Sequence, residues 1–136
     1  MSRFAQRSRE KEIMDDLECS GPVLEQTLRE LKTINRWLGG NEVTNRGLNA
    51  VVARFPQANY SLVDLGCGGG DMLAVMQGWA QKKNLRLQLT GTDANANIIE
   101  LAKERQRHLP ELRWQVANVF DPEFLKEQVD IATCTL

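Results

Sequence analysis

The stretch Val63-Asp64-Leu65-Gly66-Cys67-Gly68-Gly69-Gly70-Asp71 decides the fold of this chain. An apolar segment, Tyr60 to Leu65, precedes the glycines, and an amphipathic segment, Asp71 to Lys82, follows them. This order predicts a strand, a tight turn and a helix. Such a turn offers backbone N–H groups at a helix N-terminus to a nucleotide-like ligand.

Strands and helices alternate on the C-terminal side of this turn. The expected strands cover residues 60–65, 85–92, 112–117 and 129–135, and the expected helices cover residues 71–82 and about 95–107. A short helix should start at Asp121-Pro122, where a capping side chain precedes a proline with a preset φ. Strands that alternate with helices imply a parallel sheet with right-handed crossovers.

The N-terminal part of the chain has a helical pattern. We expect residues 1–58 to form a helical extension and residues 59–136 to form the sheet domain. Pro22 suits the first position of a helix, and Gly39-Gly40 suits its end. Between them, Leu24, Leu28, Leu31, Ile34 and Leu38 recur at helical spacing. A further helix is expected at about 41–54, and a weaker helical segment at 9–17.

The acids around the glycines indicate the charge of the ligand. The dinucleotide fingerprint G-x-G-x-x-G fails at its last glycine, where Asp71 stands. Asp71 would repel a pyrophosphate at the helix N-terminus, the place where an anion should sit. Asp64 is likewise a poor neighbour for a diphosphate and suits a ligand that carries an ammonium and a sulfonium. An NAD-dependent oxidoreductase is therefore the less favoured alternative.

A second acid follows the next expected strand. Asp93 lies 27 residues after Gly66. An acid at this position can accept hydrogen bonds from both hydroxyls of a ribose. Asp93 could instead cap the helix that follows, because aspartate is a favoured N-cap residue.

These residues together resemble a known family. Asp64 to Gly70 resembles motif I, (D/E)-x-G-x-G-x-G, of the class I S-adenosylmethionine-dependent methyltransferases, and Gly91-Thr92-Asp93-Ala94 resembles their motif II. Ala117-Asn118-Val119 matches the position after the third strand, and residues 129–134 resemble the fourth motif. The resemblance implies S-adenosylmethionine as the cofactor. It also implies the cofactor-binding residues Asp64, Gly66, Cys67, Gly68, Gly70, Asp93, Ala94, Asn118, Val119 and Cys134.

Each matched position has an implied role. The acid of motif II binds the ribose, Asn118 meets the adenine amino group, and Val119 offers its backbone N–H. Asn118 departs from the commoner aspartate but keeps an acceptor oxygen. The family transfers a methyl group, here to a small-molecule acceptor, and no catalytic residue can be named. Asn118 could also be an ordinary loop residue, and Cys67 and Cys134 could be small residues at the core edge.

The resemblance also implies the sheet topology. The family's sheet is doubly wound and Rossmann-like, with seven strands in the order 3-2-1-4-5-7-6, and this chain ends on the fourth. We therefore expect a truncated sheet of about four strands, in the order 3-2-1-4, that carries the cofactor half. The fourth strand would then be an exposed edge, and such edges favour self-association. The alternative function is a non-catalytic fragment that only binds cofactor or self-associates.

The tryptophans are expected in the core. Trp37, Trp79 and Trp114 stand at spacings typical of packed residues. For Trp37 an alternative stays open, since with Met14 it could line the acceptor pocket.

Composition argues against several other classes of protein. The 136 residues carry a net charge of −1, which argues against a nucleic-acid surface. No apolar run approaches the ~20 residues of a membrane helix, and no signal-peptide core is present. Three scattered cysteines and one histidine, His108, suit neither a disulfide framework nor a metal site. A cytoplasmic location is expected.

Overall fold

The computed structural model describes residues 16–126 and 128–135. Most of the weak helical segment expected at 9–17 lies outside them, as does Met14. The elements are α1 (Pro22–Trp37), α2 (Gly40–Arg54), β1 (Asn59–Leu65), α3 (Asp71–Lys82), β2 (Arg86–Asp93), α4 (Ala96–Arg105), β3 (Arg113–Val116), the 3-10 turn η2 (Phe124–Lys126) and β4 (Ile131–Thr133). Two of these helices, α1 and α2, lie within the described part of residues 1–58.

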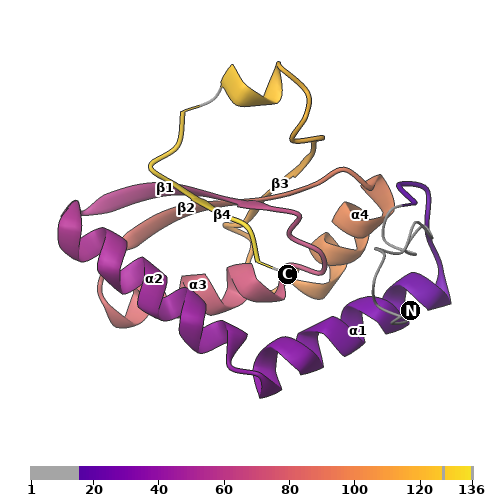
Figure 1. Cartoon of the computed structure of the whole chain (residues 1–136), viewed down its shortest axis with the longest axis horizontal. Coiled ribbons are helices and arrows are strands. Elements are labelled where there is room, and N and C mark those ends of the chain that lie inside the picture. Colours follow the sequence, from indigo (N-terminus) through magenta and orange to yellow (C-terminus); the bar gives the residue numbers. More distant parts are fainter. Residues whose placement is uncertain (1–15, 127, 136) are drawn as a thin grey trace, which may run out of the picture.

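The sheet has four parallel strands in the order β3-β2-β1-β4. The predicted fold class and strand order are therefore confirmed. Figure 1 shows all four α-helices on one side of the sheet, and only the segment that carries η2 on the other. The β4 strand is shorter than expected, because only Ile131 to Thr133 pair with β1.

The core lies between the sheet and α3. Leu73 and Met76 of α3 are fully buried, and the side chains of Leu62 and Leu89 on the sheet are nearly so. Full burial of one such side chain contributes roughly 1.5–3 kcal/mol. The indole N–H of Trp79 donates to Oδ1 of Asn49 at 3.0 Å, which ties α3 to α2.

A smaller apolar cluster holds α1. Leu24 and Leu28 pack against Ile98 of α4, with Cys19 and Leu101 at the margin. Polar contacts anchor the same end of the helix, since Arg105 Nη2 donates to the Glu25 carbonyl at 3.1 Å and Asn95 Nδ2 to the Cys19 carbonyl at 2.9 Å.

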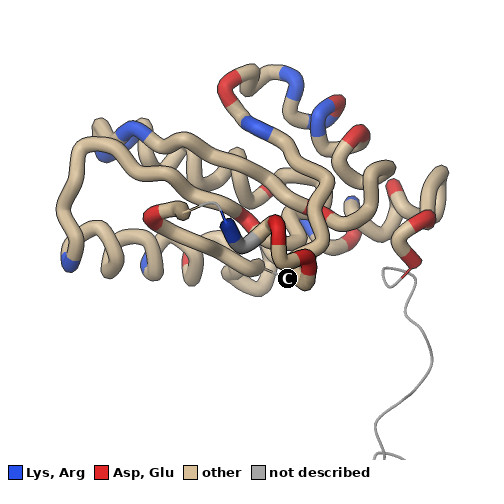
Figure 2. Tube along the Cα trace, turned by 90° about the horizontal axis from the view of Figure 1, so that it is seen from above, with Lys and Arg blue, Asp and Glu red and all other residues tan. Residues whose placement is uncertain are grey.

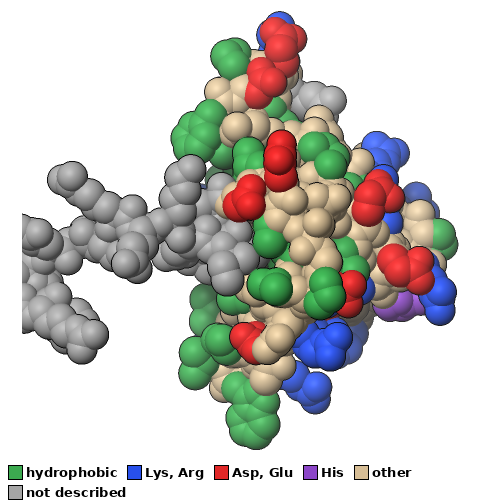
Figure 3. Space-filling model, turned by 90° about the vertical axis from the view of Figure 1, so that its right-hand side faces the viewer, with side chains coloured by type: hydrophobic (Ala, Val, Ile, Leu, Met, Phe, Trp, Pro, Cys, Tyr) green, Lys and Arg blue, Asp and Glu red, His purple; other side chains and the backbone are tan. Residues whose placement is uncertain are grey.

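The later turns of α1 project beyond this cluster. Trp37 is 83% exposed and Leu38 is 81% exposed. Figure 3 shows exposed apolar side chains at the lower end of the molecule, where Figure 1 places the α1–α2 junction. The prediction that Trp37 packs in the core is therefore wrong. The first turns of α1 pack against α4, and the last turn, which carries Trp37, extends beyond that contact. Trp79 is buried and Trp114 packs against the core, as predicted.

Candidate functional site

The glycine turn joins the carboxyl end of β1 to the start of α3. Gly66, Gly68 and Gly70 have φ values of 68°, 52° and 73°, a region that favours glycine. Two backbone bonds hold the turn: Cys67 N donates to the Thr92 carbonyl at 2.8 Å, and Gly70 N to the Cys67 carbonyl at 3.0 Å. These bonds give the turn a defined shape.

Side chains at the C-terminal end of α4 and in β3 pack against the turn. Gln106 is buried, and its Nε2 donates to the Gly69 carbonyl at 3.2 Å. A Cβ on Gly69 would lie 2.7 Å from Nη1 of Arg105, and a Cβ on Gly70 would lie 2.5 Å from Cη2 of Trp114. The end of the Arg105 side chain can move, whereas at Gly70 a Cβ would meet a packed aromatic ring, so Gly70 is the position that requires glycine.

Two clefts meet at this turn. The first, of about 540 Å³, is named here the strand-end cleft and is lined by Leu17, Leu65, Gly66, Asp93, Ala94, Ile98, Ala117, Asn118, Val119, Phe120 and Cys134. The second, of about 280 Å³, is named the α1 cleft and is lined by Leu28, Leu31, Lys32, Asn35, Gly66, Cys67, Gly68, Gly69, Asp71, Met72, Asp93 and Thr135. Gly66 and Asp93 belong to both, so one elongated ligand could occupy both clefts.

Asp93 is held in place by the backbone around it. Its Oδ1 accepts from Asn95 N at 3.0 Å, and its Oδ2 accepts from Gly68 N at 3.4 Å. Asn95 is the N-cap of α4, and its Oδ1 accepts from Asn97 N at 2.8 Å. The alternative that Asp93 caps this helix is thus wrong, and its carboxylate lies between the two clefts.

Asp64 is completely buried beneath the turn. Its Oδ1 accepts from Thr133 Oγ1 at 2.7 Å, and its Oδ2 has no hydrogen-bond partner among the described residues. Burial raises the pKa of Asp64 to about 6, although the bond from Thr133 opposes the change. A buried carboxylate with a free oxygen suits a cation or a hydrogen-bond donor nearby.

Cys67 lies beside these acids and is also buried. Burial raises the pKa of its thiol, and the charges of Asp93 and Asp64 raise it further. The thiol is therefore neutral, which agrees with the interpretation of Cys67 as a packed residue and not a nucleophile.

Asn118 follows β3 at the rim of the strand-end cleft. Its Oδ1 accepts from Phe120 N at 3.0 Å, which forms a local turn. Val119 and Phe120 are exposed beside it and line the same cleft. Sequence patterns did not single out Phe120, because a loop residue has no periodicity that would mark it.

The structure brings most of the predicted binding residues together. All except Asp64 and Gly70 line one or both clefts. Gly70 is instead packed against Trp114, and Asp64 lies below the surface. The sequence interpretation missed the α1 side of the site, Leu28, Leu31 and Lys32, because helical spacing predicts a helix but not what it covers.

Three further observations concern the described part of the chain. No cluster of three or more His, Cys, Asp or Glu residues suited to a metal ion occurs within residues 16–126 and 128–135. Both acidic and basic residues are spread along the described chain (Figure 2). Among the described helices, none is both long and apolar enough to span a membrane.

Known methyltransferases are similar in sequence to the part of the chain that carries this site. A family model described as a methyltransferase domain matches residues 62–136. A 2-phytyl-1,4-naphthoquinone methyltransferase from Nostoc sp. is 38% identical over 74 residues, which are 52% of this chain and 31% of that protein. The enzyme of the same name from Trichormus variabilis matches equally. This chain thus spans about a third of the length of these curated relatives.

Solved structures share the fold. An amino pentose methyltransferase from Micromonospora echinaspora, bound to S-adenosylmethionine, has a TM-score of 0.55 and 23% identity over 88% of this chain and 44% of its own. A putative S-adenosylmethionine-dependent methyltransferase from Methanococcus maripaludis has a TM-score of 0.53 and 13% identity, over 85% of this chain and 48% of its own. The family model covers more than half of the chain, motif I glycines included. The chain therefore belongs to the methyltransferase domain family and has the fold of the class I S-adenosylmethionine-dependent methyltransferases.

Proposed function

We propose that this chain is the cofactor-binding part of an S-adenosylmethionine-dependent methyltransferase that acts on a small molecule. The observation that carries the proposal is the position of the Asp93 carboxylate, fixed by two backbone N–H groups where the two clefts meet. An adenosine group in the strand-end cleft and a methionine group in the α1 cleft would place their shared ribose beside it.

The residues present fit such a ligand. Asp93 would accept from the ribose hydroxyls, and Asn118 and Val119 would contact the adenine. Ala94 and Cys134 would line the same cleft, while Gly66, Cys67 and Gly68 would face the methionine part. The Oδ2 of buried Asp64, which has no hydrogen-bond partner within the described part of the chain, favours positive charge close by. Asp71 adds negative charge at the N-terminus of α3, which favours a cationic donor over the pyrophosphate of a dinucleotide.

The bound cofactor would supply an electrophilic methyl group on a sulfonium. The chain's own contribution would be positioning and the exclusion of water. Leu28, Leu31 and Met72 give the α1 cleft an apolar wall suited to this task. We propose no general base, and the neutral Cys67 thiol does not serve as a nucleophile.

Acceptors differ within this fold, since the relatives' names specify a naphthoquinone and an amino pentose. We propose a small-molecule acceptor for this chain. Three free cysteines, at positions 19, 67 and 134, support a reducing compartment, and we propose the cytoplasm.

The proposal is tested by titration calorimetry with S-adenosylhomocysteine. The wild-type chain should bind it, and Asp93→Asn should weaken binding about tenfold to a hundredfold, since a hydrogen bond to a charged group contributes roughly 1.5–3 kcal/mol. Glu100→Gln, an exposed acid on α4, is the matched control and should leave affinity unchanged. Binding of NADH in place of S-adenosylhomocysteine would support the oxidoreductase alternative, and binding of neither would support a non-catalytic fragment.

We also propose that the β4 edge pairs with a second copy of the chain. Among the described strands, β4 is bonded to β1 alone. Beside it, the sheet face that the α-helices do not cover has a hollow lined by Val63, Leu65, Thr90, Gln115, Phe124, Val129 and Ala132. An open edge next to an apolar face favours association.

Light scattering over a concentration series tests this pairing. The apparent mass of the wild-type chain should rise with concentration, and Ala132→Lys should suppress the rise because charge blunts a strand edge. Ala53→Lys, on the exposed side of α2, is the control and should associate like the wild type. A constant monomeric mass for the wild-type chain would refute the pairing.

A further inference from the structure

Helix α1 lies directly over the glycine turn. A Cβ on Gly68 would lie 3.3 Å from Cδ2 of Leu28, so helix and turn are in contact. Leu28 is buried, and four residues later Lys32 follows on the same side of the helix. Leu28 and Lys32 both line the α1 cleft, together with the glycines of the turn.

Lys32 is the one Lys or Arg among the residues that line this cleft. The other charged groups of the lining are the carboxylates of Asp71 and Asp93. Lys32 Nζ lies 2.8 Å from Asp71 Oδ1, and the two side chains are 58% and 24% exposed. Exposed ion pairs of this kind are weak. The ammonium can therefore leave Asp71, or bridge to a further acceptor, at little cost.

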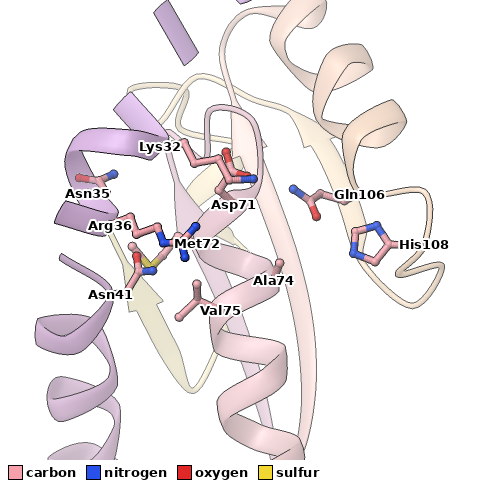
Figure 4. Close-up of a pocket in the computed structure, with 10 residues that line it drawn as sticks. All are labelled: Lys32, Asn35, Arg36, Asn41, Asp71, Met72, Ala74, Val75, Gln106 and His108. Atoms are coloured by element: carbon pink, nitrogen blue, oxygen red, sulfur yellow. The ribbon is translucent and has the colours of Figure 1, made fainter. Parts of the chain in front are cut away.

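A neighbouring pocket shares residues with the α1 cleft but has a second cation, Arg36, in its lining. Figure 4 shows Lys32 and Asp71 side by side at the upper end of a second pocket of about 350 Å³, between α1, α2 and α3. Arg36 lies within that pocket and is not part of the α1 cleft. Lys32 and Asp71 belong to both. Arg105 also contacts the glycine turn, at Gly69, but it is not among the residues that line the α1 cleft. Lys32 is thus the cation that lines this cleft beside the turn.

The methionine part of the proposed cofactor carries three charged groups. Its ammonium and sulfonium are cations, which the acids of the cleft complement. Its carboxylate is an anion and needs a donor, and of the charged side chains in the cleft only Lys32 is a donor. A lysine ammonium forms a strong, charge-assisted hydrogen bond with a carboxylate.

We propose that Lys32 binds the carboxylate of the cofactor's methionine part, which makes α1 a specificity element of the cofactor site. This inference rests on the function proposed above. Lys32 would be a cofactor-binding residue with no part in the chemistry of methyl transfer. It would also account for α1 lying over the turn, since the helix then contributes both the apolar cover, Leu28, and the charge.

The test compares two ligands that differ only in that carboxylate. S-adenosylmethionine has it, and decarboxylated S-adenosylmethionine lacks it. Titration calorimetry should show that Lys32→Gln weakens binding of S-adenosylmethionine about tenfold, the effect of one charge-assisted hydrogen bond. The same change should not weaken binding of the decarboxylated ligand. The wild-type preference for the carboxylated ligand should therefore disappear in the variant.

Arg36→Gln is the matched control, since it removes the same charge one turn further along α1. It should leave both affinities unchanged, and Lys32→Arg should keep most of the preference. Equal weakening of both ligands by Lys32→Gln, or weakening of neither, would overturn the role of Lys32 while the proposed cofactor stands. Failure of the wild-type chain to bind either ligand would overturn the proposed function, and this inference with it.

Discussion

Replacement of Gly70 by alanine should lower the free energy of unfolding by about 3–5 kcal/mol. Gly70 has a φ of 73°, and a Cβ there would lie 2.5 Å from Cη2 of Trp114. The same ring packs closely against Gly91, where a built Cβ would lie 2.9 Å from its Cζ3, so the ring is held between closely packed neighbours. The cost therefore combines a strained backbone with an overpacked core.

Urea denaturation followed by circular dichroism measures this effect, and α3 offers a matched control. Gly78 lies within the same helix, and a Cβ there would have no neighbour within 4 Å. Gly78→Ala should therefore stabilise the chain, by about 0.5–1 kcal/mol, because alanine loses less entropy in a helix. A Gly70→Ala variant as stable as Gly78→Ala would show that Trp114 gives way, and that the turn tolerates a side chain.

Asp64→Asn should change how stability depends on pH. The folded chain raises the pKa of Asp64 from 3.8 to about 6. The folded state therefore holds this proton more tightly than the unfolded state, and stability falls as pH rises from about 4 to about 6. Above pH 6 the full penalty applies, about 3 kcal/mol at 1.36 kcal/mol per pKa unit.

The variant has no proton to lose at this position. Measured by urea denaturation, the stability of Asp64→Asn relative to the wild type should rise by roughly 2–2.5 kcal/mol between pH 4 and pH 8, because part of the penalty is already present at pH 4. Any constant effect of the amide cancels in this difference. A relative stability that does not change with pH would mean that Asp64 is not buried as a free carboxylate.

Asp130 is a control for the direction of the pKa shift, because its pKa is lowered whereas that of Asp64 is raised. Hydrogen bonds from the backbone and side chain of Ser61 lower its pKa below 3.8. A lowered pKa gives stability that is present above the unfolded value and is lost only as pH falls further. Asp130→Asn should therefore show a constant relative stability between pH 5 and pH 8, where Asp64→Asn still changes up to about pH 6.

The cost of a charged Asp64 also links stability to the proposed ligand. A cation bound near its free Oδ2 would lower the pKa again, because an opposite charge favours the ionised form. The same buried oxygen that destabilises the ligand-free chain at neutral pH would thus stabilise the complex.

Local patterns sufficed for most of the fold. Apolar alternation and glycines predicted the strands and helices from residue 59 on, because these signals depend on neighbours in the chain. The parallel sheet followed from the alternation of elements, and its order 3-2-1-4 from the resemblance to a family. Asp93 and Asn118 could be selected in advance for a related reason: both follow a strand, and the carboxyl ends of parallel strands meet at one edge.

The sequence did not predict the features that depend on contacts between residues far apart in the chain. The spacing of α1 predicted an amphipathic helix, yet Leu28 covers the glycine turn while Trp37 is exposed. Helical periodicity predicts which residues share one face of a helix. It does not predict how much of that face a neighbouring element covers.

The sequence by itself thus determined the order of strands and helices along the chain, the position of the glycine turn and the acids around it, since each is set by residues adjacent in the chain. Only the tertiary structure decided that Asp64 is buried with a free oxygen, that Gly70 packs against Trp114, and that Lys32 reaches Asp71. These outcomes depend on contacts between elements far apart in sequence, and burial and packing are properties of the assembled fold.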